Sequence, residues 1–455
     1  MTPDVQALTL QAGSVFTPGA PIQEMDLFAG RRKQVERVID AISQRGCHAI
    51  LYGEQGVGKT SLSNMISGFL AGRRAFVVSR TNCDLSDSFS SLWTRALKDI
   101  EAARGQQIGL SGRRLAPAVA HAGEPMAPDS IRRILQEISA TAALVIVFDE
   151  FDRIKNSEVV MAMTDMIKAL SDNSINATIL IIGVGDSVNE LIHEPRPIER
   201  ALVQVPIPKM PDDEIRDFID KGLSRLAMGI DSTAREHLVL LSQGVPYIAH
   251  LLCFYISRAA LEIGHKTVSL SLVEEGMNRA LDQWQQSIKT LYNEAIQSQQ
   301  SGHVYKEVLL ACALADVDEL GYFSAAGIKK PLSWITNRNF ETAKYKRQLR
   351  DLCEPLRGSV LQRIGESYRL RYRISNPILR PYIIMRGIND KVITKAQLSE
   401  WKSASHKPVG ESRIPAPLKT DCPEGNCVMI EHSVADKGPR LFSSRPVPLA
   451  SWKRV

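Results

Sequence analysis

The sequence predicts an α/β protein in which a helix-covered parallel sheet is followed by an all-helical region and then by helices with a β-hairpin. Between about residues 25 and 208, short apolar runs alternate with amphipathic helical patterns, as in parallel strands connected by helices. A glycine-rich loop follows the first of these runs and precedes a helix. After about residue 211 the apolar residues recur with a helical period only, which indicates a second region.

The expected elements of the first region follow from these patterns. The apolar runs predict strands at 48–52, 75–79, 143–149, 177–184 and 203–207. Amphipathic patterns predict helices at 34–44, 61–70, 86–102, 129–139 and 157–170. Residues 105–128 are rich in Gly, Ala and Pro and predict an inserted surface loop. Residues 1–24 are rich in Pro, Gly, Thr and Gln and predict an extended lead-in to the α/β domain at 25–208.

The rest of the chain divides into three parts. Residues 209–300 predict an all-helical lid domain, with helices at 212–226, 232–241, 245–263 and 271–282. Residues 301–388 combine helical stretches at 304–315, 324–335 and 340–353 with a strictly alternating hairpin at 361–364 and 368–374. This is the outline of a winged-helix domain. Residues 389–455 have little periodicity and predict a largely disordered basic tail.

Composition excludes several classes of protein. The chain of 455 residues is 44% hydrophobic and 23% charged, as in soluble globular proteins. No apolar stretch approaches the roughly 18 residues of a membrane span, and the N-terminus lacks a secretory signal. Seven scattered cysteines indicate reduced thiols and a cytoplasmic location. Cys422, Cys427 and His432 are too few for a closed zinc site, so free thiols are the simpler interpretation.

The strongest motif is Gly53-Glu-Gln-Gly-Val-Gly-Lys-Thr60, which matches G-x-x-x-x-G-K-[ST] at every fixed position. Glycines let backbone N–H groups surround a phosphate, and the helix start favours negative charge. We expect Lys59 to reach the β- and γ-phosphates of ATP and Thr60 to bind Mg²⁺. The alternative is a glycine-rich turn that arose by chance. The predicted nucleotide-binding residues of this loop are Gly53, Glu54, Gln55, Gly56, Val57, Gly58, Lys59, Thr60 and Ser61.

The second motif is the apolar run 144–148 followed by Asp149 and Glu150. Ligands of open parallel sheets bind beyond the carboxyl ends of the strands. We expect Asp149 to hold Mg²⁺ and Glu150 to polarise the water that attacks the γ-phosphate. The alternative is a solvated acidic strand end.

Residues 26–264 resemble AAA+-type P-loop ATPases of the branch that holds the STAND signalling ATPases and the archaeal and eukaryotic origin-recognition initiators. The resemblance rests on the two motifs above, on Leu27-Phe-Ala-Gly-Arg31, on the segment 196–200 and on Gly244-Val-Pro246. It implies that Phe28 and Arg31 lie beside the adenine and that Pro246 contacts the nucleotide. It also implies an arginine finger that reaches the γ-phosphate bound by a neighbouring subunit. Arg200 is the first candidate and Arg196 the second, and an ordinary surface arginine is the alternative.

Two positions depart from the family pattern. The sensor 1 position, usually Asn, falls on Asp186 or Ser187. The sensor 2 arginine is replaced by the Gly244-x-Pro246 motif that resembles the STAND pattern. Hydrolysis is therefore expected to be slow and switch-like, unless other residues complete the site. His250 either reaches the nucleotide or is a structural histidine in an apolar helix.

The net charge of +6 is unevenly distributed. Residues 336–386 hold twelve basic residues against four acidic ones. A basic helix beside a basic hairpin is the arrangement that follows the phosphates of a DNA duplex. The alternative is a winged helix that contacts proteins. The predicted DNA-binding residues are Lys344, Arg347, Arg369, Arg371 and Arg373.

Three functions remain open from the sequence. The first is an ATP-driven DNA-binding protein that forms a homo-oligomer in the ATP state. The second is a STAND-type switch whose winged helix binds an effector protein. The third is a regulator of transposition or defence that recruits a separate enzyme.

Overall fold

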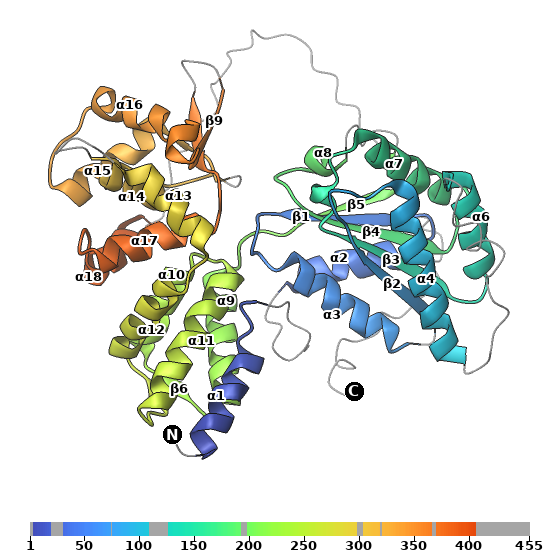
Figure 1. Ribbon diagram of the computed structural model, residues 1–455, viewed down its shortest axis with the longest axis horizontal. Coiled ribbons are helices and arrows are strands. Elements are labelled where there is room, and N and C mark those ends of the chain that lie inside the picture. The colour runs from blue at the N-terminus through green and yellow to red at the C-terminus, as the bar shows by residue number, and fades with distance from the viewer. Residues whose placement is uncertain are drawn as a thin grey trace, which may run out of the picture. The chain divides into compact units, whose positions relative to one another are not determined.

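A five-stranded parallel sheet forms the centre of the α/β region (Figure 1). In this computed structural model, the described residues are 3–19, 31–73, 75–108, 126–192, 198–297, 304–318, 321–365 and 370–405. The strand order is β2-β3-β4-β1-β5, and every neighbouring pair is parallel. The strands are β1 (His48–Gly53), β2 (Phe76–Asn82), β3 (Ala143–Asp149), β4 (Ala177–Val184) and β5 (Leu202–Pro206).

Helices cover both faces of this sheet. Along β3, Leu144, Ile146 and Phe148 enter the core beneath α4, α6 and α7, while Val145 and Val147 enter the core beneath α2 and α3. The alternation follows from the two-residue period of a strand, so a β3 buried on both faces must be apolar at every position. The helices are α2 (Arg32–Ser43), α3 (Lys59–Ala71), α4 (Phe89–Ile108), α6 (Pro128–Ile138), α7 (Ser157–Asp172) and the short α8 (Val188–Leu191).

The next region is helical, as the periodicity predicts. It contains α9 (Asp212–Arg225), α10 (Ser232–Ser242), α11 (Pro246–Glu262), α12 (Leu270–Asp282) and α13 (Gln286–Ile296), with a two-stranded pairing of β6 (Gly229–Ile230) and β7 (Thr267–Val268). The tightest packing joins α11 to α12, where an added Cβ at Gly276 would lie 2.9 Å from the Ile256 backbone. Only glycine permits this approach.

The C-terminal region has helices and a small antiparallel sheet in the order β8-β10-β9. It shares one hydrophobic core with α9–α13, because Tyr382 packs its ring against Trp284 and Tyr292 at 5.2 and 5.4 Å. Its elements are α14 (Tyr305–Leu314), β8 (Phe323–Ser324), α15 (Lys329–Thr336), α16 (Thr342–Asp351), β9 (Leu361–Ile364), β10 (Arg371–Ile374), α17 (Leu379–Asn389) and α18 (Lys395–Ser405).

Both expected irregular ends contain helices. Where composition predicts an extended lead-in over 1–24, residues 3–15 form α1 (Pro3–Val15). Ala12, Val15 and Phe16 lie three and four positions apart, and all three are buried in the core that contains α11. The expected disordered tail, 389–455, begins with α18, whose Leu398 is buried in the same core. Tertiary packing overrides the local composition in both places.

Other sequence expectations concern residues beyond those described. These include most of the 105–128 loop, the three zinc candidates near the C-terminus, and residues 406–455. In the described part of the chain, no helix combines the length and apolar character needed to cross a bilayer.

Candidate nucleotide-binding site

The glycine-rich loop connects β1 to α3 in a conformation that its glycines permit. Gly56 and Gly58 have φ angles of 82° and 93°, values that disfavour any residue with a Cβ. A Cβ at Gly53 would lie 2.4 Å from the carbonyl oxygen of Ile207. The loop is thus shaped by the fixed positions of the motif.

Lys59 is the first residue of α3, and its ammonium group folds back over the loop. Its Nζ donates hydrogen bonds to the carbonyl oxygens of Gly53 at 2.9 Å and Glu54 at 2.8 Å. Burial lowers the pKa of Lys59 to about 8, while the nearby Asp152 and Asp149 oppose that shift. At neutral pH the group therefore stays mostly protonated, and a bound polyphosphate would raise its pKa further.

Asp149 ends β3 and is almost fully buried. Its Oδ1 accepts hydrogen bonds from the Thr60 hydroxyl at 3.3 Å and from the Glu150 N–H at 2.9 Å. Its Oδ2 accepts a 2.6 Å bond from Nη2 of Arg80, which lies on the adjacent strand β2. The carboxylate is therefore held by a cation that the sequence pattern did not indicate.

Thr60 and Asp149 fit a magnesium site. A hydroxyl and a carboxylate within hydrogen-bonding distance are the hard oxygen ligands that Mg²⁺ prefers, and Mg²⁺ usually takes its other ligands from phosphates and water. The described residues hold no cluster of three or more His, Cys, Asp or Glu side chains arranged for a metal.

Glu150 follows directly and has a left-handed backbone with φ of 57°. This turn carries its side chain away from β3, and the side chain is 52% exposed. Its Oε2 accepts a 2.9 Å hydrogen bond from Nη1 of Arg153. The candidate base thus lines the cavity but is paired with a nearby arginine.

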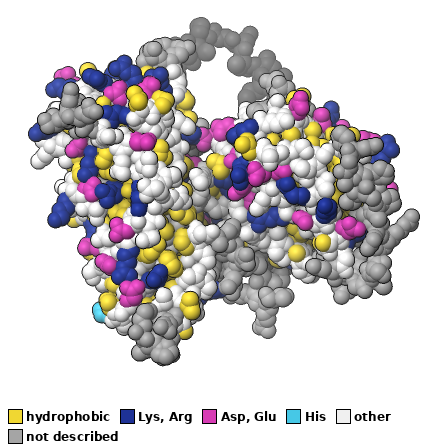
Figure 2. Space-filling view, in the orientation of Figure 1, with side chains coloured by type: hydrophobic (Ala, Val, Ile, Leu, Met, Phe, Trp, Pro, Cys, Tyr) yellow, Lys and Arg dark blue, Asp and Glu magenta, His cyan; other side chains and the backbone are white. Residues whose placement is uncertain are grey.

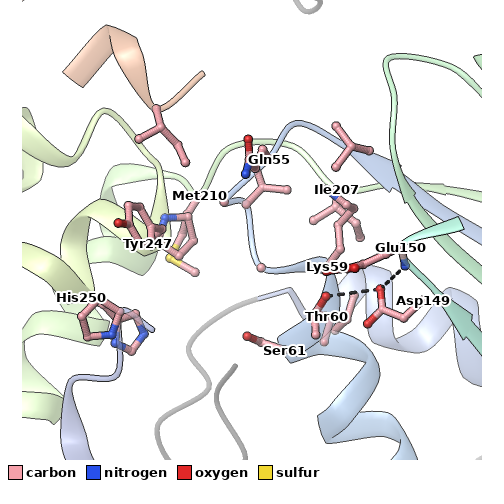
Figure 3. Close-up of a pocket in the computed structure, with 18 of the residues that line it drawn as sticks. Gln55, Lys59, Thr60, Ser61, Asp149, Glu150, Ile207, Met210, Tyr247 and His250 are labelled. Carbon is pink, nitrogen blue, oxygen red and sulfur yellow. Dashed lines mark hydrogen bonds between the residues drawn. The ribbon is translucent and has the colours of Figure 1, made fainter. Parts of the chain in front are cut away.

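These residues surround a cavity of about 700 Å³, which is within the usual range for small-molecule sites. Figure 3 shows Lys59, Thr60, Asp149 and Glu150 on one side and Tyr247 and His250 on the other. The second side also includes Phe218 of α9 and the segment 17–19. One end is therefore polar and charged, and the other is largely apolar.

The Gly244-x-Pro246 turn brings α11 to the loop. Gly244 has φ of 70°, its carbonyl accepts a 2.7 Å bond from the Met210 N–H, and a Cβ there would meet the Met210 oxygen at 2.8 Å. Pro246 occupies the first turn of α11 and lines the cavity. The next residue, Tyr247, donates its N–H to the Gly56 carbonyl at 3.4 Å.

Arg31 also lines the cavity, and its expected place beside the adenine stays a prediction. It is buried, its φ is 62°, and its Nη2 donates to the carbonyl of Val57 at 3.1 Å. Its N–H donates to Glu214 on α9 at 3.2 Å, and its Nη1 is buried without a partner among the described residues. Arg31 thus contacts the phosphate-binding loop, and burial lowers its pKa. Phe28 lies outside the described residues.

Several predicted residues do not line the cavity. Arg200 is exposed in the turn before β5, and Arg196 lies outside the described residues. At the end of β4, Gly183 and Val184 line the cavity, whereas Asp186 forms an ion pair with Arg373 of β10. The expectation that Asp186 acts at the nucleotide is not supported by this geometry, because its carboxylate is engaged elsewhere.

The basic residues of the C-terminal region differ in exposure. On α16, Tyr345 and Leu349 are buried, and the opposite side is exposed and basic, with Lys344, Lys346, Arg347 and Arg350. Space-filling views show dark blue side chains gathered on the surface of this region (Figure 2).

The arginines of the hairpin form ion pairs and hydrogen bonds within the chain that the sequence does not predict. Arg371 pairs with Asp318 at 2.9 Å. Arg373 pairs with Asp186, bonds Gln362 at 2.8 Å and lies over a tyrosine ring, so its side chain is only 17% exposed. Arg369 is not among the described residues. The alternating pattern of the strand correctly places Arg371 and Arg373 on one face of the hairpin. In the structure, however, both side chains on that face pair with carboxylates of the same chain.

The site residues that sequence reasoning missed include Arg80, Arg153 and Thr17. Arg80 is the one charged residue of β2, but nothing in the sequence connects it with Asp149, which it reaches only because β2 pairs with β3. Thr17 lies in the segment that was expected to be extended, so nothing placed it at the cavity.

Comparison with known proteins agrees with this geometry. Residues 27–182 match the family model described as AAA ATPase domain. No curated protein is significantly similar in sequence.

The chain is also similar to several solved structures at low identity. The chain is similar to the ORC2 protein of Aeropyrum pernix, with 16% identity and a TM-score of 0.46 over 86% of this chain and 98% of that one. It is also similar to a Walker-type ATPase of Pyrococcus abyssi, with 14% identity and a TM-score of 0.49 over 81% and 99%. A third is Cdc6p of Pyrobaculum aerophilum, with 14% identity and a TM-score of 0.43 over 84% and 99%. Together, the loop, the Asp149-Glu150 pair and the family match identify residues 27–182 as an AAA ATPase domain of the P-loop type.

Proposed function

We propose that this protein is a Mg²⁺-dependent ATP-binding and hydrolysing ATPase that couples its nucleotide state to the binding of duplex DNA. The observation that carries the enzymatic part is the convergence of Lys59, Thr60, Asp149 and Glu150 on one cavity. These are the residue types that phosphoryl transfer to water requires.

Each residue has a distinct role in the proposed reaction. Lys59 exchanges the loop carbonyls for the β- and γ-phosphates, and Thr60 and Asp149 hold Mg²⁺, which would neutralise phosphate charge. Glu150 orients the attacking water once its side chain leaves Arg153. Because Glu150 must leave Arg153 before it can orient the water, we expect hydrolysis to be slow.

The DNA-binding part rests on α16. This helix has an exposed basic face. It belongs to an arrangement of three helices and a small sheet that we interpret as a winged helix: α14, α15, α16 and β8-β10-β9. Lysine and arginine side chains on such a helix bind phosphates of a duplex, so the affinity should fall steeply with salt.

We also propose a homo-oligomer in the ATP state, with Arg200 acting on the nucleotide of a neighbouring subunit. Arg200 is exposed and is not among the residues that line the chain's own cavity, and both observations support that role. Mixing Arg200→Ala with Glu150→Gln subunits should then restore part of the activity that each variant lacks.

A second function is favoured by the Arg373–Asp186 pair. A hairpin arginine held by the ATPase domain suits a switch that releases the C-terminal region to an effector protein. In that case, DNA would have no effect on the ATPase rate.

The deciding experiment measures the ATPase rate with and without duplex DNA. We expect Lys59→Ala to lose nucleotide binding, Glu150→Gln to bind ATP without turning it over, and DNA to change the wild-type rate. The double variant Lys344→Glu/Arg347→Glu should lose DNA binding.

The matched control is Lys98→Glu/Lys266→Glu, which makes the same charge change at exposed positions elsewhere and should retain DNA binding. Wild-type turnover by Glu150→Gln would refute the assigned base. Equal DNA affinity of the two double variants would refute the DNA interface.

A further inference from the structure

Arg153, which holds the candidate base Glu150, also faces a second carboxylate that the proposed reaction leaves unused. Its Nη1 donates to Oε2 of Glu150 at 2.9 Å, while its Nη2 lies 3.9 Å from Oδ1 of Asp84. The hydrogen bond from Glu150 and the charge of Asp84 both raise the pKa of Arg153. One guanidinium therefore lies between two carboxylates, with a hydrogen bond to the first and a longer ion pair to the second.

The carboxylate of Asp84 is placed there by the loop 83–88, which connects β2 to α4. The loop begins beside the site, because the Cys83 N–H donates to the carbonyl oxygen of Asp149 at 2.8 Å. Oδ1 of Asp84, the oxygen that faces Arg153, accepts the N–H of Leu85 at 2.5 Å. The orientation of the carboxylate is thus set by its own loop.

A buried ion pair braces this loop. The side chain of Asp87 is 5% exposed, and its two oxygens accept hydrogen bonds from Arg95 at 2.7 and 2.6 Å. Oδ2 of Asp87 also accepts the Asp84 N–H at 2.7 Å, and Arg95 donates to the carbonyl oxygen of Asn82 at 3.0 Å. A bidentate pair fixes geometry as well as charge. Asp84 therefore has a defined position although its side chain is 59% exposed.

We propose that Asp84 is a positioning residue for ATP hydrolysis, which receives Arg153 and so releases Glu150 to orient the attacking water. The proposal rests on the proposed function, in which Glu150 is the base. A shift of the guanidinium by about 1 Å would turn the 3.9 Å contact with Asp84 into a hydrogen bond of ordinary length. Because Arg153 has a carboxylate partner in both positions, the exchange leaves no arginine unpaired.

The triphosphate is the other place to which Arg153 could move, since Arg153 and Glu150 line the cavity and Asp84 does not. In that case the arginine would stabilise charge that develops in the transition state, and its removal would slow hydrolysis. In our proposal its removal frees Glu150. The two destinations therefore predict opposite effects of Arg153→Met on the rate.

Single-turnover hydrolysis and equilibrium binding of ATP, both measured on the full chain, test the proposal. We expect Asp84→Asn to lower the hydrolysis rate about two- to fivefold, the range that follows from the small energies of exposed ion pairs. ATP affinity should stay within about twofold of wild type. Asp84→Glu retains the carboxylate and should keep most of the rate. Asp172→Asn, the matched control at an exposed position at the end of α7, should hydrolyse ATP at the wild-type rate.

The double variant Arg153→Met/Asp84→Asn separates positioning from a structural role. Arg153→Met alone should hydrolyse ATP at least as fast as wild type. Adding Asp84→Asn should then change nothing further, because Asp84 acts only through Arg153. A structural role of Asp84 would instead lower the rate equally in both backgrounds. Thermal unfolding of each variant checks that it is folded.

Three results would overturn the proposal: a wild-type rate in Asp84→Asn, the same loss from Asp84→Asn with and without Arg153, or loss of hydrolysis in Arg153→Met. If Asp84→Asn does not fold, Asp84→Ser takes its place, because a serine hydroxyl can still accept the Leu85 N–H. It removes the charge that receives Arg153, so the same loss is expected and a wild-type rate would refute the role.

The proposed function fails separately. If Glu150→Gln hydrolyses ATP as fast as wild type does, Glu150 is not the base, whatever Asp84 does. If Glu150→Gln is inactive and Asp84→Asn has the wild-type rate, the base is correct and only the role of Asp84 is wrong.

Discussion

Arg80 provides a direct test of how the site is held together before magnesium binds. Its guanidinium donates a 2.6 Å bond to Oδ2 of Asp149, whose side chain is 3% exposed, whereas the Arg80 side chain is 29% exposed. Replacing Arg80 by Met leaves a buried carboxylate whose remaining hydrogen bonds among the described residues, from Thr60 and Glu150, both go to Oδ1. The loss of this ion pair at a buried carboxylate is the source of the predicted instability.

The magnitude follows from the burial of the pair. Removing one partner of a fully buried ion pair costs about 3–5 kcal/mol. Because Arg80 is partly exposed, we expect a loss of about 2–3 kcal/mol in the free energy of unfolding without Mg²⁺. Mg²⁺ with ATP should then stabilise Arg80→Met more than wild type, since the metal supplies the positive charge that the variant lacks.

Chemical unfolding with EDTA and with Mg²⁺-ATP measures both effects. The double variant Arg80→Met/Asp149→Asn is the control, because neutralising the carboxylate should remove most of the added penalty. The reasoning is refuted if Arg80→Met unfolds at the wild-type denaturant concentration in EDTA, or if the two proteins gain equally from Mg²⁺-ATP.

Three further predictions concern other parts of the chain. Burial lowers the pKa of His48 to about 4, so between pH 6.5 and 4 the unfolded state binds more protons at this residue. The contribution of His48 to the free energy of unfolding should therefore fall by about 2 kcal/mol from pH 7 to pH 5, and denaturant titrations of His48→Asn should lack this part of the pH dependence. Gly222→Ala places a Cβ 2.4 Å from the buried ring of Phe16, which should destabilise the protein by about 1–3 kcal/mol, and Phe16→Leu should relieve part of this loss. Asp186→Asn removes the carboxylate that holds Arg373, so if DNA is the partner, duplex affinity should rise severalfold in titrations with labelled DNA.

Matched control variants separate these specific effects from nonspecific effects of a substitution on stability or net charge. Gly68→Ala adds a methyl group in α3 where nothing lies within 4 Å, so it should not destabilise the protein. Asp165→Asn changes the same charge as Asp186→Asn at an exposed position of α7, and it should leave DNA affinity unchanged. Equal effects in a test variant and its control would contradict the corresponding prediction.

The phosphate side of the site could be predicted from sequence because it is contiguous. The glycines, Lys59 and Thr60 lie within one loop and helix turn, and Asp149 ends an apolar run whose direction fixes where the carboxylate emerges. Local geometry therefore determines most of this half of the cavity.

The other half depends on contacts between distant segments. Arg80 reaches Asp149 only because β2 pairs with β3, and Thr17 reaches His250 across 233 residues of sequence. The helix before Thr17 forms where composition suggests an extended chain, since its buried residues stabilise it through packing on α11. Contacts between residues so far apart in the sequence leave no recognisable local sequence pattern.

The net charge of the C-terminal region likewise does not show which basic side chains are available to a partner. Net charge counts every arginine, yet the half-buried Arg380 donates to the carbonyl oxygens of residues 313 and 315, and Arg357 donates to those of residues 295 and 297. Arg373 is paired with Asp186. Among the described residues, α16 presents Lys344, Lys346 and Arg350 as exposed basic side chains, and its Arg347 pairs with Asp351 at the longer distance of 3.7 Å. We therefore expect α16 to be the main basic surface available to a duplex.

Charge reversal on α16 should consequently weaken DNA binding more than charge reversal on β10. We expect Lys344→Glu/Arg347→Glu to reduce duplex affinity by at least tenfold more than Arg371→Glu/Arg373→Glu, and to reduce the salt dependence by about two phosphate contacts. Both variants change the net charge equally, so a purely long-range attraction would affect them alike. A larger loss from the hairpin variant would instead mean that DNA displaces the carboxylates from Arg371 and Arg373, and that the released hairpin, rather than α16, is the DNA-binding surface.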